Sequence, residues 1–133
     1  MAVYVTDTHP LLWFTSGKHR KLSPRALRAF RNAKAGKSLI HIPLPVLWEV
    51  ILLLRRGRIR LETSFEVWSS AITASPGFDL APMDLGTLIE TQRFHVNEDP
   101  FDAAIVATAR LLEFPLITAD SSITDSNVVE IYW

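Results

Sequence analysis

The sequence predicts an α/β fold, a three-layer α/β/α sandwich around a central parallel β-sheet, in a single domain spanning residues 1–133. Short apolar runs rich in β-branched and aromatic residues alternate with longer segments of helical pattern. This alternation is typical of parallel sheets covered by helices. Helix starts are also marked, because Ser23-Pro24 and Asp99-Pro100 each place a capping residue before a proline at the first helical position.

The expected elements follow one another along the whole chain. Short apolar runs predict strands at residues 2–6, 38–42, 78–81, 115–118 and 128–132. Apolar spacing and capping residues predict helices at residues 8–15, 23–35, 46–56, 64–74, 84–93 and 99–113. We expect Pro43 and Pro45 to bracket a turn, and a short turn to connect the last two strands.

The composition is that of an ordinary globular protein. The chain has 133 residues, 48% hydrophobic and 21% charged, which is enough to bury a core. It contains no cysteine, which excludes disulfides, thiolate metal sites and a cysteine nucleophile. The first residues lack a signal-peptide pattern, and the longest strongly apolar run, residues 50–54, is too short to span a membrane. We therefore expect a cytoplasmic protein without a membrane partner.

The zero net charge conceals a strong asymmetry between the two halves of the chain. Residues 1–60 hold twelve of the fourteen Lys and Arg and only two acids, a net of +10, and residues 61–133 carry the opposite net of −10. Such asymmetry suggests a polyanionic partner such as nucleic acid. The alternative is that the two halves pair with each other across the fold. A nucleic-acid partner would be attracted by basic residues among Arg25, Arg28, Arg31, Arg55, Arg56 and Arg58.

Four acids stand where a parallel sheet would bring them together. Asp7 and Asp120 each end an apolar run, Asp102 opens a helix-like stretch, and Glu49 interrupts a strongly apolar one. Ligands of open parallel sheets bind at the carboxyl ends of the strands. Carboxylates that converge there repel one another unless a cation lies between them, and Mg²⁺ or Mn²⁺ suits carboxylate ligands.

Each acid also has an ordinary structural explanation. Asp7 and Asp99 could be helix N-caps, Asp102 would favour a helix dipole, and Asp120 could belong to a turn. Glu49 is explained least well, because no residue three or four positions away can form an ion pair with it. A basic partner elsewhere in the fold remains open for Glu49.

Other active-site patterns are absent from the sequence. The four histidines show no metal-ligand spacing, and there is no nucleophile elbow or glycine-rich phosphate loop. Hydroxyls of Thr8, Thr118 and Ser121 stand beside the acids and could orient water or a phosphate oxygen, although turn hydroxyls facing solvent explain Ser121 better.

Several motifs together resemble the PIN-domain family, in its VapC-type branch of ribonuclease toxins from prokaryotic toxin–antitoxin pairs. The matching segments are Asp7-Thr8-His9-Pro10-Leu11-Leu12-Trp13, Leu47-Trp48-Glu49, Asp99-Pro100-Phe101-Asp102 and Leu116-Ile117-Thr118-Ala119-Asp120. Residues 22–26 and 57–61 match as well, so the resemblance covers essentially the whole chain. One position departs from the family pattern, because Ala103 stands where an arginine often follows the third acid.

The resemblance implies a metal-dependent endoribonuclease that hydrolyses RNA with metal-activated water. It assigns the Mg²⁺- or Mn²⁺-binding, catalytic acids to Asp7, Glu49, Asp102 and Asp120. Asp99, Thr8 and Thr118 would orient the site or the substrate, and Arg25, Arg28, Arg55, Arg56 and Arg58 would contact RNA. It also implies a homodimer that is held inactive by a small antitoxin protein.

Two other classes of function remain open at this stage. A receiver-like or phosphatase-like domain also places acids at strand ends, but it would need a lysine after a late strand, and no lysine follows Lys37. The second alternative is a non-catalytic RNA- or protein-binding module that retains the same fold. Binding of metal without cleavage of RNA would favour that module.

Overall fold

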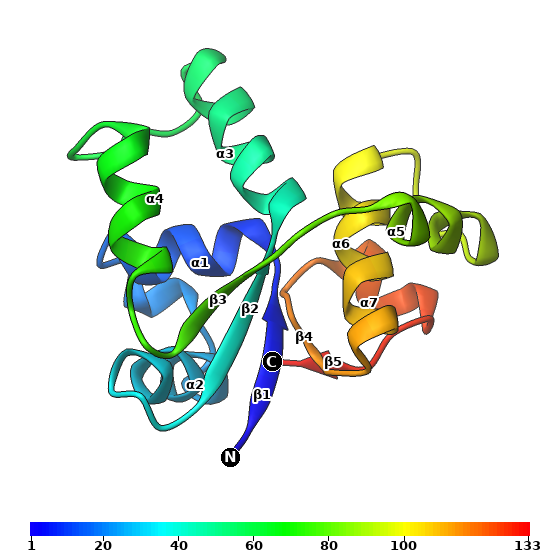
Figure 1. The fold of residues 1–133 in the computed structure, drawn as a ribbon, viewed down its shortest axis with the longest axis horizontal. Helices are drawn as coiled ribbons and strands as arrows, with labels where there is room; N and C mark the ends of the chain where they lie inside the picture. The colour runs from blue at the N-terminus through cyan, green and yellow to red at the C-terminus, as the bar shows by residue number, and fades with distance from the viewer.

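A five-stranded, wholly parallel sheet forms the centre of the molecule (Figure 1). The computed structural model describes all residues, Met1–Trp133. The strands are β1 (Val3–Thr6), β2 (Leu39–Pro43), β3 (Phe78–Ala81), β4 (Leu116–Ile117) and β5 (Ile131–Tyr132), in the spatial order β3-β2-β1-β4-β5. All five lie within the apolar runs that predicted them, except that β2 extends one residue further to Pro43.

Seven helices flank this sheet. They are α1 (Thr8–Thr15), α2 (Pro24–Lys34), α3 (Leu44–Arg55), α4 (Phe65–Thr73), α5 (Leu85–Glu90), α6 (Pro100–Leu112) and α7 (Ser121–Ser126), with short 3₁₀ turns at His19–Lys21 and Thr91–Arg93. The predicted caps are present, because the side chains of Ser23, Asp84 and Asp99 each accept a backbone N–H at the start of α2, α5 and α6. No helix is both long and apolar enough to cross a lipid bilayer.

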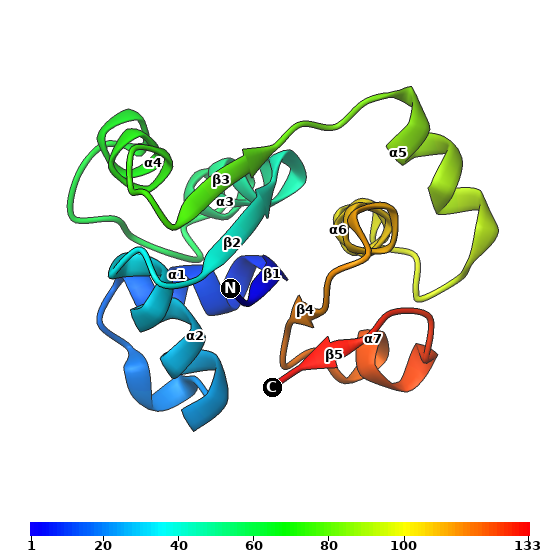
Figure 2. The ribbon, with the colours of Figure 1, turned by 60° about the horizontal axis from the view of Figure 1, so that its bottom comes forward.

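The connections between strands place helices on both faces of the sheet. The chain moves outward from β1 to β2 and β3 and then returns past β1 to β4 and β5. Right-handed crossovers put α1 to α4 on one face and α5 to α7 on the other. Figures 1 and 2 show α2 and α6 on opposite sides of the central strands, and these helices pack on β2 and on β1 with β2, respectively. The three-layer α/β/α prediction is therefore confirmed.

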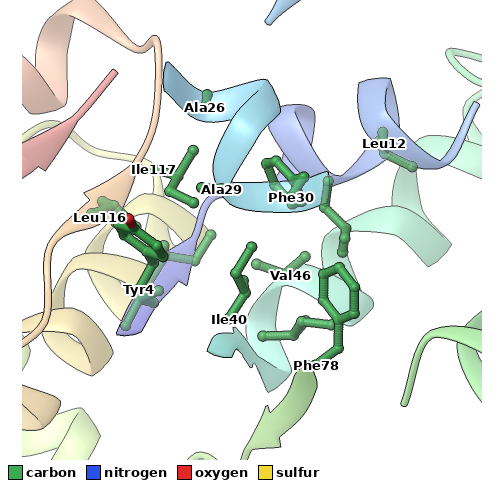
Figure 3. Packing of buried hydrophobic residues seen from close by; sticks show 14 of the residues in the cluster. Tyr4, Leu12, Ala26, Ala29, Phe30, Ile40, Val46, Phe78, Leu116 and Ile117 are labelled. Carbon is green, nitrogen blue, oxygen red and sulfur yellow. The ribbon is translucent and has the colours of Figure 1, made fainter. Parts of the chain in front are cut away.

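The core extends over both faces of the sheet, with α2 and α3 on one side and Ile105 and Val106 of α6 on the other. Phe30 of α2 is fully buried, with its ring centroid 5.0 Å from that of Phe14 and 6.3 Å from that of Phe78. Figure 3 shows Phe30 over Ile40 and Val46, which are also fully buried. Truncating such an aromatic side chain to alanine typically costs about 3–5 kcal/mol, so this cluster fixes α2 and α3 against the strands.

Two details of the sequence-based description are wrong. The connection between β4 and β5 is not a turn, because residues 121–126 form helix α7, which Asp120 caps. The segment SSITDS has little apolar periodicity, which is why the pattern did not indicate a helix. No turn separates β2 from α3 either. The strand ends at Pro43 and the helix begins at Leu44, where Pro45 is tolerated because the first-turn N–H groups have no intrahelical partner.

The remaining differences concern element ends. Strands β4 and β5 pair over only two residues each, shorter than predicted, and the predicted helix at 84–93 is α5 followed by the 3₁₀ turn Thr91–Arg93. Ends of elements depend on tertiary hydrogen bonds that local composition does not specify.

Candidate active site

Two of the four acids flank the point where the strand order reverses. Asp7 directly follows β1 and Asp120 follows β4, and these neighbouring strands lead to opposite sides of the sheet. In open α/β sheets the crevice at such a point, beyond the carboxyl ends of the strands, is the usual ligand site. Both acids are also helix N-caps. Asp7 accepts the N–H of Thr8 in α1, and Asp120 accepts those of Ser122 and Ile123 in α7.

The other two acids reach the same edge from helices. Asp102 lies in the first turn of α6 and Glu49 lies in the middle of α3, and α3 and α6 contact each other. Asp99 caps α6 by accepting the N–H of Phe101 at 2.8 Å. The capping role considered for Asp7 and Asp99 is therefore real, and it coexists with their position beside the other acids.

Two threonines connect the first part of this acidic edge. Thr8 donates its hydroxyl to Glu49 Oε1 and its backbone N–H to Asp7 Oδ1 at 2.8 Å. Thr118 donates its hydroxyl to the second oxygen of Asp7, Oδ2, at 2.7 Å. The same hydroxyl accepts the backbone N–H of Asp120 at 3.0 Å. Thr8 and Thr118 thus lie where the sequence analysis expected residues that orient the acids.

An asparagine and a serine continue the chain of hydrogen bonds to the last acid. Ser122 donates its hydroxyl to Asp120 Oδ1 at 2.6 Å. The side-chain amide of Asn97 donates both to Ser122 Oγ and to Asp102 Oδ2, each at 2.9 Å. All four acids therefore belong to one continuous network. Hereafter the term acidic network means Asp7, Glu49, Asp102 and Asp120 together with Thr8, Thr118, Asn97 and Ser122.

Sequence reasoning missed Asn97 and Ser122. Neither belongs to a motif that was recognised, and the hydroxyl that had been considered, Ser121, is exposed and makes no side-chain hydrogen bond in the network. A signal was nevertheless present, since Asn97 precedes the Asp99-Pro100 helix start by two residues, where an amide side chain can bond the following backbone.

No lysine or arginine forms an ion pair with the acidic network, and burial raises the pKa of Glu49 although the charge of His9 opposes this effect. The ion pairs of the molecule involve Glu90, Asp79 and Glu98, and none involves Asp7, Glu49, Asp102 or Asp120. The ion pair with a basic residue that had remained open for Glu49 is therefore not formed, and the side chain is held by the Thr8 hydroxyl.

Burial and mutual repulsion raise the proton affinity of these acids. Burial raises the pKa of Asp7, and the charges of Glu49 and Asp120 add to the effect. Burial also raises the pKa of Glu49, with further contributions from Asp99 and Asp102. For Asp102, burial and the neighbouring carboxylates raise the pKa from 3.8 to about 6. The charge of one acid therefore affects the pKa of another, which indicates that the acids lie close together.

The donor set suits a hard divalent cation. Glu49, Asp102 and Asp120 each have one carboxylate oxygen held by a protein donor and a second oxygen, Oε2, Oδ1 and Oδ2 respectively, without any. No buried side-chain oxygen lacks a partner, so these three oxygens face solvent. Oxygen-only donors fit Mg²⁺ or Mn²⁺. No three acidic or histidine side chains are already close enough to form a closed metal site, so a cation would have to draw them together.

The lysines and arginines of the first sixty positions form no ion pairs within the fold. Pairing between the two halves of the chain, considered above as an explanation of the charge asymmetry, therefore does not occur apart from the His41–Asp79 contact.

The arginines expected to contact RNA fall into two groups. Arg25 and Arg28 are on α2, whereas Arg55, Arg56 and Arg58 are at the end of α3 and just beyond it. All five are exposed, and Arg25 lies over the ring of Tyr132, 4.3 Å from its centroid. Figure 1 places α2 and the last turn of α3 far apart, so a bound RNA would have to extend along the molecule to meet both groups.

The fold and the acidic edge define a class of α/β protein with carboxylates at a topological switch point. The PIN-domain family model matches residues 4–126. The chain therefore belongs to the PIN-domain family.

Solved structures agree with this fold. A chain of the VapBC2 complex from Rickettsia felis, bound to a DNA fragment from its promoter, aligns with a TM-score of 0.69 at 12% identity, covering 98% of this chain and 97% of the other. A chain of a toxin–antitoxin complex from Klebsiella pneumoniae aligns with a TM-score of 0.60 at 20% identity, covering 97% and 95%. A comparison with curated proteins finds no match.

Proposed function

We propose that the protein is a divalent-cation-dependent endoribonuclease, a VapC-type toxin of a toxin–antitoxin pair. One observation carries the proposal: four carboxylates share a hydrogen-bonded network at the carboxyl edge of the sheet, and no lysine or arginine forms an ion pair with them. Membership of the PIN-domain family and the likeness to two toxin–antitoxin structures support the same conclusion.

The acids Asp7, Glu49, Asp102 and Asp120 would hold Mg²⁺ or Mn²⁺. Such a cation lowers the pKa of water and stabilises the negative charge that develops on a phosphodiester under attack. Glu49, Asp102 and Asp120 each offer a solvent-facing oxygen for this purpose. Asp7 has both oxygens engaged, by Thr8 and Thr118, so it fixes the geometry of the site as well as adding charge.

The neighbouring side chains would prepare the acids for the reaction. Thr8 and Thr118 orient Glu49 and Asp7 by hydrogen bonds, which limits the positions that these carboxylates can adopt. Asp99 caps α6 and adds negative charge beside Glu49. Carboxylates that are partly held in advance need less reorganisation when the cation draws them together.

RNA would be attracted by the basic residues that are free of ion pairs. Arg25, Arg28, Arg55, Arg56 and Arg58 are exposed, and they belong to the half of the chain with net charge +10. Contacts between such side chains and phosphates make binding weaken as salt concentration rises. With RNA as its substrate, the enzyme would act in the cytoplasm.

The partners we propose are an antitoxin protein and a second copy of the chain. The two solved structures named above are toxin–antitoxin complexes by their descriptions, which supports an antitoxin here. Exposed apolar side chains of α3 and α5, namely Trp48, Leu85, Leu88 and Ile89, support a homodimer through that surface. Sedimentation velocity at several protein concentrations would test the dimer.

The test of the proposed activity is cleavage of a mixed pool of structured RNAs by the purified chain with Mn²⁺. We expect cleavage that EDTA abolishes and that the Asp102→Asn variant lacks. A chain that binds Mn²⁺ but leaves every RNA in the pool intact would instead favour the non-catalytic binding module. Undiminished activity of Asp102→Asn would contradict the assignment of the site.

A further inference from the structure

Asn97 is the residue that fixes the Asp102 carboxylate. It lies in the loop between the Thr91–Arg93 turn and α6, where its Oδ1 accepts the backbone N–H of Asp99 at 2.8 Å. Its amide nitrogen donates to Asp102 Oδ2 and to Ser122 Oγ, each at 2.9 Å. Only this orientation of the amide is consistent with both neighbours, since a carboxylate needs a donor and a backbone N–H needs an acceptor.

Ser122 connects the Asn97 amide to Asp120. Its hydroxyl donates to Asp120 Oδ1 at 2.6 Å, and the same oxygen accepts the backbone N–H groups of Ser122 and Ile123. The Oδ1 atom of Asp120 is therefore fully engaged, and its Oδ2 atom has no protein partner. The same division holds for Asp102, whose Oδ2 is bound by Asn97 and whose Oδ1 is not.

The Asn97 amide and the Ser122 hydroxyl form the direct side-chain connection between these two acids. The Asn97 amide supplies the one side-chain or backbone hydrogen bond that the Asp102 carboxylate accepts, and the two acids belong to different helices, α6 and α7. The charge of Asp120 acts on Asp102, so the two carboxylates repel each other in the absence of a cation. A neutral link that donates toward both acids keeps them together in spite of that repulsion.

We propose that Asn97 and Ser122 form a positioning link that sets the separation of Asp102 and Asp120 and directs their free oxygens to one divalent cation. This inference rests on the proposed function, because it assumes that these acids bind the cation. Partners that orient metal-binding side chains typically change metal affinity by about 10–100-fold when removed. The link is a pair of side chains that touches neither the cation nor the substrate.

The test is calorimetric titration of Mn²⁺ into the purified chain and its variants. We expect Asn97→Ala and Ser122→Ala each to weaken Mn²⁺ binding by about tenfold or more, and Ser122→Thr, which keeps the hydroxyl, to restore it. Because both residues act through one link, the double variant should lose little more affinity than the weaker-binding single variant. Asn32→Ala, on the exposed face of α2, is the matched control and should bind Mn²⁺ as the parent does.

Thermal unfolding without metal separates positioning from a purely structural role. Ser122→Ala keeps both backbone hydrogen bonds to Asp120 that cap α7, so this variant should fold even if Asn97→Ala does not. Unchanged Mn²⁺ affinity in folded Ser122→Ala would contradict the positioning role of Asn97 and Ser122, and so would strictly additive losses of affinity in the double variant. Neither result would contradict the proposed cation site. A parent chain that binds no Mn²⁺ would overturn both the link and the proposed function.

Discussion

Two groups of buried or half-buried carboxylates in this protein have opposite electrostatic surroundings. Glu90, at the end of α5, is buried and bound by Arg110 Nε at 2.9 Å and by Arg93 at 2.7 Å. These hydrogen bonds lower the pKa of Glu90. The acidic network has hydroxyl and amide donors but no ion pair with a lysine or arginine, and burial with mutual repulsion raises the pKa of Asp7 and Asp102.

The difference separates a carboxylate with a structural role from those to which we assign a function. Arg110 also donates to the carbonyl oxygen of Val128 at 2.7 Å, so the Glu90 cluster ties α5 and α6 to the segment before β5. The acidic network is stabilised by nothing of this kind, and a cation from outside would relieve its repulsion. Burial of a carboxylate alone therefore does not indicate a site, whereas burial without a cationic partner does.

The largest contrast is expected in catalysis. Replacing Glu49 by Gln should reduce Mn²⁺-dependent RNA cleavage by more than about 100-fold, because a carboxylate that holds the cation is lost. Asp125→Asn removes an exposed acid of α7 outside the network and is the matched control, with activity within a factor of about two. Gel assays of a labelled RNA would measure both. If both variants lost cleavage activity to the same extent, the acids of the network would not differ in function from an acid on the surface.

A change in the Glu90 cluster should reduce stability and leave RNA cleavage unchanged. Arg110→Met removes the partner of Glu90 and of the Val128 carbonyl, so the midpoint of thermal unfolding should fall by roughly 5–10 °C. Cleavage by the folded variant should remain at the level of the parent, because Arg110 makes no contact with the acidic network. Differential scanning calorimetry measures the first effect. A variant with unchanged stability would show that Glu90 does not need its counter-ion.

Metal should stabilise the protein through the network. Mn²⁺ at one hundred times its dissociation constant should raise the free energy of unfolding by about 2.7 kcal/mol, and EDTA should remove this gain. The gain should be smaller in Asp102→Asn and unchanged in Arg110→Met. Urea denaturation with and without Mn²⁺ would measure it. Equal stabilisation of Asp102→Asn and the parent would place the bound cation elsewhere.

The two groups should also respond to pH with opposite signs. Because the pKa of Asp102 is raised from 3.8 to about 6, the folded protein keeps a proton there that the unfolded chain has lost. Stability of the metal-free protein should therefore fall as the pH rises from about 4 to about 6, by about 1 kcal/mol after allowance for solvent screening.

The lowered pKa of Glu90 acts in the other direction, since its stabilising effect is lost as the pH falls below the ordinary range of a glutamate. Unfolding curves of the parent and of Asp102→Asn, compared between pH 4 and pH 7, would isolate the contribution of Asp102. Parallel profiles for the two proteins would mean that Asp102 is not perturbed.

The smallest effect is expected for Asp7→Asn without metal. The asparagine oxygen can still accept the N–H of Thr8, and the Thr118 hydroxyl can turn to accept from the new amide. The change removes a charge that Glu49 and Asp120 repel, so the variant should be as stable as the parent or more stable by up to about 1 kcal/mol. A loss of about 1 kcal/mol or more in urea denaturation would assign the Asp7 charge a structural role.

The sequence was sufficient to predict the strands, helices and caps that depend on local chemistry. The strands and most helices have short apolar runs, caps and proline starts, and the structure places them accordingly. It also predicted that acids far apart in the chain would meet, because the ends of parallel strands lie along one edge. Helix α7 was not predicted, since its six residues owe their helical state to the Asp120 cap and the docking of Ile123 in the core rather than to periodicity.

The connecting residues of the site could not be predicted in the same way. Asn97 and Ser122 have no charge and stand in no recognised motif, and only the approach of the loop before α6 to the start of α7 gives them common neighbours. Likewise, the sequence could not exclude a basic partner for Glu49, because any of the twelve Lys and Arg of the first half could have reached it. The residues that connect the acids and the partners of Glu49 are both determined by contacts across the fold, which composition does not specify.

The most direct test of the central claim is to locate the cation. A crystal of the protein soaked in Mn²⁺ and measured at the manganese absorption edge would show the ion as an anomalous peak. We predict a peak about 2.1 Å from the free oxygens of at least two of Glu49, Asp102 and Asp120. A peak only at other residues, or none at a Mn²⁺ concentration that supports cleavage, would contradict the conclusion that this unneutralised network is the metal site.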